Sequence, residues 1–326
     1  MSNWVKYRNG NYDVFLNLEN GTKIRKNDLD NLTPEYPESM DIKLTNKCHH
    51  NCTMCHEAST SNGKHGDILN AAFIETLQPY TELALGGGNP LEHPDLEIFL
   101  RKCKSLKLIP SMTVHQDDFM NNLEFLRMLR DEVLIWGIGV SISYVTDELI
   151  EALHEFPNAV CHIIAGIATE AVINKLAHND LKVLILGYKI FRRGEALYEK
   201  DSTNIDFLIQ YMYDILPDMV NNGWFNTISF DNLAIEQLNP SRLLTEEQYE
   251  EFFMGSDGSH TMYVDLVNRN FGVSSTAKER YPLEDHILPM FHKVCDVSGH
   301  KYERGADTIM YERSIAKNDT SKKHWN

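Results

Sequence analysis

From residue 40 onward, short apolar or β-branched segments alternate with segments whose apolar residues recur at helical spacing. The strand-like segments lie at residues 40–45, 82–86, 108–115, 133–142, 159–165, 180–187 and 225–230. Between them the pattern is amphipathic, as in residues 95–105, where one face carries Leu96, Phe99, Leu100 and Cys103. Such alternation favours βα units and a parallel sheet. Six or seven units predict an α/β fold, a partial (β/α)6-7 TIM-like barrel. The pattern leaves a doubly wound open sheet as the alternative.

The segments on either side of this region have a different character. Residues 1–38 predict a β-meander, because Asn9-Gly10 and Asn20-Gly21 are hairpin turn signals between short β-type runs. After residue 231 the regularity fades. A helix over 245–254 and a hairpin over 260–275 predict an α+β appendage, which we expect to close the barrel. The expected domains are therefore 1–38, 39–231 and 232–326.

Three of the six cysteines crowd into one CxxxCxxC segment, Cys48, Cys52 and Cys55. This segment directly follows the first strand of the predicted barrel, and chemistry gathers at the carboxyl ends of parallel strands. Three thiolates can hold three corners of an iron–sulfur cubane and leave one iron open. Zinc is the alternative, with a nearby histidine (His49, His50 or His56) as fourth ligand, although structural zinc sites usually have paired cysteine knuckles.

The spacing and place of the cysteines resemble the signature of the radical S-adenosylmethionine (SAM) superfamily. The resemblance implies one oxygen-sensitive [4Fe-4S] cluster on Cys48, Cys52 and Cys55, with SAM bound to the fourth iron. It further implies reductive cleavage of SAM to a 5′-deoxyadenosyl radical that abstracts hydrogen from a substrate. In this family the residue before the third cysteine is often aromatic; here it is Met54, whose thioether can pack in a similar way.

A glycine-rich segment at the end of the second predicted strand strengthens the resemblance. Gly86, Gly87, Gly88 and Asn89, followed by a proline, stand where the family has a Gly-Gly-Glu-Pro motif. Glycines let a backbone approach a ligand closely, and the resemblance implies that this segment binds the methionine part of SAM. Asn89 replaces the acid of the motif, so it can accept a hydrogen bond without a charge.

Three weaker candidates for SAM binding lie at later strand ends. Ser141 and Ser143 end the fourth strand, where the family places a polar side chain against SAM, and they share one face by the period of two. Gly166 follows the fifth strand and resembles an adenine-binding stretch. Each has an equally simple structural interpretation, as a small residue in a tightly packed barrel.

Five residues are candidates for contacting substrate. Lys189 and Arg193 follow the sixth strand and could hold an anionic group. Asp231 ends the seventh strand and His115 the third, while Cys295 in the appendage could donate a hydrogen atom. The structural alternatives are a solvated basic loop for the cations, a satisfied histidine for His115 and a buried thiol for Cys295.

Composition limits the partners. Lys and Arg number 31 against 47 Asp and Glu, a formal charge of −16, which repels phosphate backbones and anionic membranes. We therefore expect no membrane partner and regard nucleic acid as a poor partner. The resemblance to radical SAM enzymes implies a peptide or small-molecule substrate and an electron donor such as flavodoxin or ferredoxin. The first residues lack the apolar core of a signal peptide, which predicts a cytoplasmic protein.

Two other functions fit parts of the sequence. One is a non-catalytic zinc-binding scaffold protein, which would be colourless. The other is a SAM-dependent methyltransferase acting by polar chemistry, which would not need the cysteines.

Overall fold

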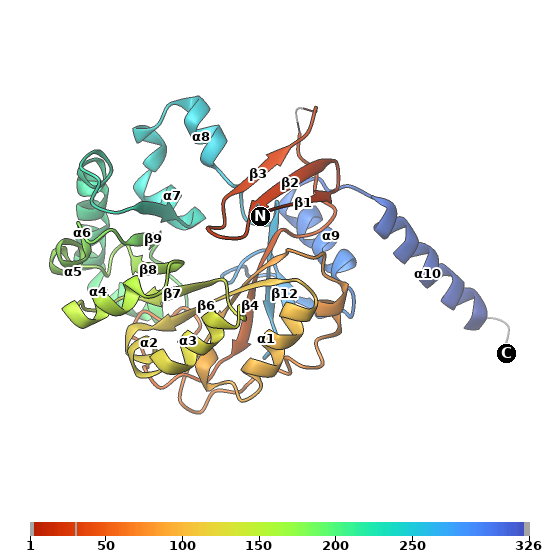
Figure 1. Cartoon of the computed structure of the whole chain (residues 1–326), viewed down its shortest axis with the longest axis horizontal. Coiled ribbons are helices and arrows are strands. Elements are labelled where there is room, and N and C mark those ends of the chain that lie inside the picture. The colour runs from red at the N-terminus through yellow and green to blue at the C-terminus, as the bar shows by residue number, and fades with distance from the viewer. Residues whose placement is uncertain (1–2, 30, 323–326) are drawn as a thin grey trace.

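A computed structural model describes residues 3–29 and 31–322 (Figure 1). Its main sheet has ten strands in the order β10-β9-β8-β7-β6-β5-β4-β11-β12-β13. The first seven follow one another in the chain and are all parallel. They are β4 (Ser39–Thr45), β5 (Glu82–Gly87), β6 (Ile109–His115), β7 (Gly137–Ser141), β8 (Ala159–Ile164), β9 (Lys182–Leu186) and β10 (Thr227–Phe230). Each overlaps a predicted strand, so the sequence prediction of a βα sheet is confirmed.

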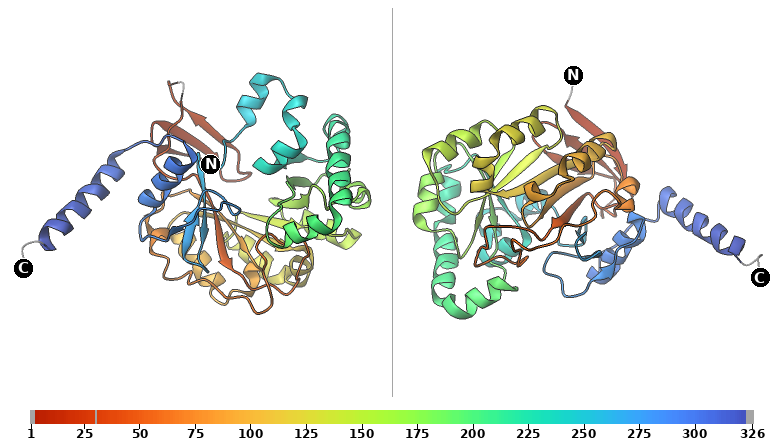
Figure 2. Two further views of the ribbon diagram at one scale, coloured as in Figure 1. Left: turned by 180° about the vertical axis from the view of Figure 1, so that it is seen from behind. Right: turned by 90° about the horizontal axis from the view of Figure 1, so that it is seen from below.

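Helices connect these strands and lie along the outside of the curved sheet (Figure 2). They are α1 (Leu96–Ser105), α2 (Gln116–Asn121), α3 (Leu123–Asp131), α4 (Asp147–His154), α5 (Glu170–Leu176), α6 (Arg193–Asn221) and α7 (Asn232–Leu238). Short 3-10 turns η1 (Ala72–Thr76), η2 (Pro90–Glu92) and η3 (Pro240–Leu243) add to the connections. Along β6 and β9 every second residue is buried against these helices, which is the pattern of a strand with one packed face.

The C-terminal segment adds three strands to the same sheet. β11 (Thr261–Asp265) pairs in parallel with β4, and β12 (Asn270–Gly272) and β13 (Tyr281–Pro282) follow in antiparallel order. The predicted hairpin over 260–275 is thus confirmed. Strands β10 and β13 end the sheet at opposite edges, so among the described residues the barrel is partial and open.

The meander forms a separate three-stranded antiparallel sheet of β1 (Trp4–Asn9), β2 (Tyr12–Asn17) and β3 (Lys23–Lys26). A buried ion-pair group joins it to the barrel: Glu38, just before β4, accepts from Arg25 Nε at 2.8 Å and lies 3.2 Å from Lys23 Nζ. The Tyr12 hydroxyl donates to the same carboxylate. The pairing of opposite charges compensates the burial of Glu38.

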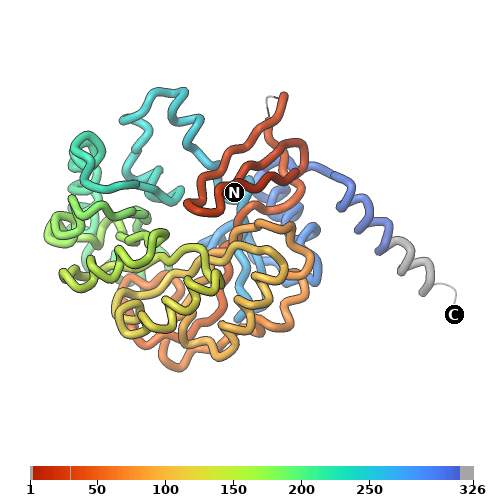
Figure 3. The backbone as a smooth tube through the Cα atoms, viewed as in Figure 1, coloured from red at the N-terminus to blue at the C-terminus, as the bar shows by residue number. Residues whose placement is uncertain are grey.

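Three further helices complete the chain: α8 (Glu246–Phe252), α9 (Ile287–Ser298) and α10 (Ala306–Lys322). Helix α9 packs its apolar face, including Phe291 and Val294, into the core. The part of helix α10 drawn in blue in Figure 3 leads away from the body of the molecule. Within the described part of the chain, no helix combines the length and apolar character needed to cross a bilayer.

Candidate functional site

The cysteines lie on a long loop, residues 46–66, that leaves the carboxyl end of β4. We call it the cysteine loop. Its two ends are joined by backbone hydrogen bonds, from Asn46 N to Lys64 O at 2.8 Å and from Cys48 N to Thr60 O at 2.9 Å. A bridge between Thr45 and His65 closes its base. These contacts hold the two ends of the cysteine loop together.

Cys48, Cys52 and Cys55 are all half-buried on this loop. A tight turn brings two of them together, with Cys55 N donating to Cys52 O at 3.3 Å. Burial raises the pKa of the Cys48 and Cys52 thiols, and the neighbouring cysteines raise both further. A nearby positive charge, such as that of a metal ion, stabilises thiols of this kind as thiolates.

The glycine segment packs directly under the start of the cysteine loop. Gly88 N donates to Thr45 O at 2.7 Å and Asn89 N to Lys47 O at 2.8 Å. A β-carbon on Gly88 would lie 2.2 Å from Lys47 O, and one on Gly87 would lie 2.5 Å from Thr45 O. Gly87 also has a φ of +103°, which disfavours other residues. These two glycines are therefore required by the loop itself.

Gly86 differs from its neighbours. A β-carbon there would meet no atom within 4 Å, so Gly86 borders open space beside the cysteine loop. Asn89 is buried, and its side-chain oxygen accepts from Leu91 N at 3.1 Å, capping η2. The sequence did not reveal this capping role for Asn89.

The segment after β9 contacts the cysteine loop from the other side. Arg193 donates to Asn51 and to Ser59 O, the latter at 2.6 Å. Arg192 donates to Glu57 O at 2.9 Å. The basic residues after the sixth strand thus meet the loop that carries the cysteines.

A buried group of charged side chains joins the cysteine loop to the neighbouring strands β4 and β11. Lys43 of β4 is 2% exposed and lies 2.7 Å from Glu57 of the loop and 3.5 Å from Asp265 of β11. Tyr263 also donates to Glu57, at 3.0 Å. Burial alone would raise the pKa of Glu57, but His56 and Lys43 outweigh it and lower the pKa. This group therefore keeps the Glu57 carboxylate of the cysteine loop charged.

The concave face of the sheet carries further titratable groups. The side chain of Asp41 lies on this open face. The loss of hydration there raises the pKa of Asp41 to about 6, although Lys189 has the opposite effect. Burial, with Lys189, lowers the pKa of His56 to about 3. Burial lowers the pKa of His162, on β8, to about 4. Sequence reasoning missed Asp41 and Lys43, although two charges at a spacing of two inside an apolar strand signal a polar concave face.

His115 and Ser143 lie together at the ends of β6 and β7. His115 Nε2 is 3.4 Å from Ser143 Oγ, and Ser141 is the register partner of His115. Gly166 lies elsewhere, packed against Ile205, Ile209 and Tyr188, with a φ of +86°. The close approach of helix α6 therefore accounts for this glycine.

The last two substrate candidates have structural partners. Asp231 accepts from Ala234 N at 2.8 Å and from Gly187 N at 2.9 Å, so it caps α7 and ties it to β9. Cys295 is fully buried in α9, its thiol donates to Gly258 O, and burial raises its pKa to about 12. Such a thiol is inert.

A cavity of about 560 Å³ lies at the opposite ends of the strands. One wall is the β2–β3 turn of the meander, and the other is made by the beginnings of the barrel strands. Glu82, Ile109, Gly137, Lys182 and Thr227 are its strand-start residues, and Ser111 and Val160 extend it between the strands. The meander thus covers the end of the barrel remote from the cysteines.

Comparison with solved structures finds three of SuiB from Streptococcus suis. SuiB bound to the precursor peptide SuiA aligns with a TM-score of 0.57 and 11% identity, over 89% of this chain and 87% of SuiB. SuiB bound to S-adenosylmethionine aligns with a TM-score of 0.56 and 11% identity, over 89% and 87%. A further SuiB structure gives 0.51 and 12%, over 83% and 81%.

No protein-family model matches this chain, and no curated protein matches it in sequence. At 11–12% identity the structural likeness is one of fold. The α/β fold of the chain is therefore similar to that of SuiB over most of the length of both proteins.

Proposed function

We propose that this protein is a radical SAM enzyme with a single [4Fe-4S] cluster held by Cys48, Cys52 and Cys55. The observation that carries the proposal is the placement of three half-buried thiols on one loop at the carboxyl end of the first barrel strand. When bound, the cluster would supply the electron that cleaves SAM to a 5′-deoxyadenosyl radical, which abstracts hydrogen from the substrate.

The chain's own groups fit a cluster at this place. Three cysteines provide three ligands, which leaves one iron for another molecule. The absence of side chains at Gly87 and Gly88 lets the cysteine loop pack against this segment. Arg193 holds the same loop through hydrogen bonds to Asn51 and Ser59. We assign Arg193 to positioning the loop in preference to binding substrate.

SAM would lie beside the loop, against Gly86. The open space at this glycine is where a ligand can reach the backbone. We propose that Gly87, Gly88 and Asn89 bind the methionine part of SAM through backbone groups. Ser141, Ser143 and Gly166 are proposed to contact the ribose and adenine. The SAM-bound state of SuiB, which has a similar fold, supports the binding of SAM by this protein.

The proposed substrate is a peptide or a small metabolite on the concave face. SuiB binds a precursor peptide, which favours the peptide. Lys189 is the best-placed of the candidates, because its charge acts on Asp41 and His56 at this face. His115, at the end of β6, is the second candidate for contacting substrate. Asp231 and Cys295 are already engaged by the backbone. The electron donor is proposed to be a flavodoxin or ferredoxin.

The test is an anaerobic assay. The protein is reconstituted with iron and sulfide, reduced with dithionite and given SAM, and 5′-deoxyadenosine is measured by chromatography. We expect a brown protein that forms the product. Replacing Cys48, Cys52 and Cys55 together by alanine should abolish both colour and product, whereas Cys103→Ala, which removes a buried core thiol of α1, should keep both.

Two outcomes would contradict the proposal. A colourless protein that carries zinc on the same cysteines would favour the zinc-binding scaffold. Full product formation by the triple alanine variant would show chemistry that does not need the cysteines.

A further inference from the structure

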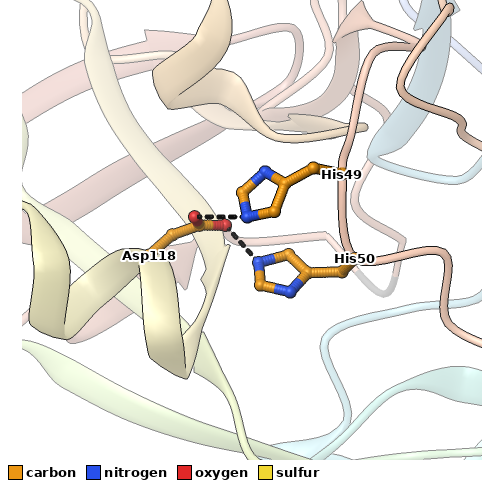
Figure 4. A group of neighbouring side chains, drawn as sticks. All are labelled: His49, His50 and Asp118. Carbon is orange, nitrogen blue, oxygen red and sulfur yellow. Dashed lines mark hydrogen bonds and ion pairs between the residues drawn. The ribbon is translucent and has the colours of Figure 1, made fainter.

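A group of side chains of the kind that bind metal ions joins the start of the cysteine loop to helix α2. Two consecutive loop histidines, His49 and His50, face Asp118 of α2 (Figure 4). His50 Nε2 is 2.7 Å from Asp118 Oδ2, and His49 Nε2 is 3.5 Å from Asp118 Oδ1. One ligand atom from each of the three side chains lies within 4.8 Å of the other two. Among the described residues, groups this close consist of histidines and aspartates, and the three thiols do not form one.

The charge of Asp118 calls for a cation. Its side chain is only 6% exposed, and a buried carboxylate needs an opposite charge or several donors. In the described part of the chain, both of its ion contacts come from histidines, and neither a lysine nor an arginine pairs with it. Two imidazoles and one carboxylate are a ligand set that suits Zn²⁺, Fe²⁺ and related divalent ions.

The other nitrogen of His49 has the partner that metal-bound histidines usually have. His49 Nδ1 lies 3.0 Å from Glu92 Oε1, so a proton on Nδ1 is held by this carboxylate. A metal ion bound to Nε2 would take the place of the proton that this nitrogen otherwise directs at Asp118, while the proton on Nδ1 stays directed at Glu92. A carboxylate–histidine pair of this kind fixes the ring and strengthens the nitrogen as a ligand. The contact between His49 and Glu92 is a separate observation from the short distances among His49, His50 and Asp118.

A third ring extends the group. The ring of His115 lies close to that of His50, with centroids 3.9 Å apart and planes tilted by 32°. The rings of His49 and His50 are 4.2 Å apart and tilted by 35°. His50, His115 and Asp117 form a second set with ligand atoms within 4.8 Å. His50 is common to both sets, which together contain five potential ligands: His49, His50, His115, Asp117 and Asp118.

We propose that His49, His50 and Asp118 bind one divalent transition-metal ion, separate from the metal centre on Cys48, Cys52 and Cys55. His115 and Asp117 border the ion, and Glu92 orients His49. Tetrahedral metal–ligand bonds of about 2.0–2.2 Å place ligand atoms about 3.3–3.6 Å apart. His50 Nε2 and Asp118 Oδ2, now 2.7 Å apart, would therefore separate slightly by side-chain rotation. Because two ligands belong to the cysteine loop and one to α2, the ion would fasten that loop to the barrel wall.

The experiment uses the full chain with its cluster reconstituted under anaerobic conditions. The protein is equilibrated with Zn²⁺, desalted, and analysed for iron and zinc by mass spectrometry. We expect about four irons and about one zinc per chain. Asp118→Asn and His50→Ala should each keep the iron and lose the zinc. His154→Ala, which removes an exposed histidine of α4, should keep both metals.

A second measurement uses the variant with all three cysteines of the loop replaced by alanine, checked for folding by circular dichroism. Added Co²⁺ should give visible ligand-field bands without thiolate charge-transfer absorption, and Asp118→Asn in this background should remove them. Glu92→Gln should weaken Zn²⁺ binding about 10- to 100-fold in chelator competition.

The two proposals fail in different ways. Zinc absent from wild-type protein that carries a complete cluster would overturn the second metal site and leave the radical SAM proposal intact. Zinc equal in wild type and Asp118→Asn, or no Co²⁺ bands from the folded triple alanine variant, would also overturn it. Co²⁺ bound by the triple alanine variant supports it even if no cluster ever assembles.

Discussion

Neighbouring glycines in one segment have different surroundings, and this difference is testable at the level of single residues. In Gly88→Ala the new β-carbon would lie 2.2 Å from Lys47 O. Relief of this overlap must move the cysteine loop, at a cost of about 1–3 kcal/mol. We expect a lower unfolding midpoint and iron content well below that of wild type. Gly86→Ala, whose β-carbon meets open space, is the matched control and should keep both. Equal iron in the two variants would contradict this account.

Lys43 gives a second residue-scale prediction. Lys43→Met leaves Glu57 and Asp265 without their shared buried cation, which should cost about 3–5 kcal/mol of unfolding free energy. Urea unfolding followed by tryptophan fluorescence measures the change. Lys6→Met removes a lysine whose ion pair with Asp13 is largely exposed, and its effect should stay below about 1 kcal/mol. Similar losses in both variants would mean that burial does not set the strength of the Lys43 pairs.

Individual roles were the part of the site least visible in the sequence. The cysteine spacing placed the three thiols on one loop, because residues so close in the chain must share a turn. The partners of Arg193 and Asp118 depend on the folded chain, since Asn51 and His50 lie many residues away. Sequence position showed that Arg193 follows a strand but could not show that it meets the cysteine loop.

At the scale of elements, the attachment of the meander depends on pH. Burial would raise the pKa of Glu38, but Lys23 and Arg25 outweigh it and lower the pKa to about 2. An unfolded chain therefore binds this proton more readily between about pH 4.5 and pH 2. The stabilisation, about 3 kcal/mol, is present above pH 4.5 and is lost as the pH falls toward 2.

Glu38→Gln should therefore lower stability at pH 7 and flatten the dependence of unfolding free energy on pH between about 4.5 and 2. Thermal or urea unfolding across this range measures both effects. Asp13→Asn, which alters an exposed ion pair of the same meander, should change the slope far less. An unchanged slope in Glu38→Gln would show that this carboxylate does not couple the meander to the barrel.

Local patterns predicted the elements well and their distant pairing poorly. The seven barrel strands and the C-terminal hairpin were each visible as runs of apolar or β-branched residues. The parallel pairing of β11 with β4 was not, because no local signal specifies a neighbour so far away in the chain. The appendage was expected to close the barrel, whereas β11 extends its sheet beside β4. The domain boundary at residue 232 stays a prediction.

For the whole molecule, the two ends of the C-terminal segment should differ in importance. A chain ending after residue 256 lacks β11 to β13 and α9, and so loses core residues such as Met262, Val264 and Phe291. We expect this variant to be insoluble or to lack a cooperative unfolding transition. A chain ending after residue 305 loses α10 and the two hydrogen bonds from Thr308 to Glu35, which should cost about 1–3 kcal/mol.

Size-exclusion chromatography and circular dichroism of the two truncated chains make the comparison. The longer chain should elute as a folded species whose helix content falls only by the contribution of α10. If the shorter chain folds equally well, β11 is an addition to a complete barrel and not part of its core.

The pairing of β4 with β11 also has a consequence for how the protein is made. Ser39 pairs with Thr261, about 220 positions later, and ribosomes add about 5–20 residues per second. The cysteine loop is therefore synthesised roughly 10–40 s before the strand that supplies Asp265 to Lys43 beneath it. During that time the nascent chain carries its three thiols without the finished support of the loop. The buried support of the cysteine loop is therefore completed only when β11 has been made and has paired with β4.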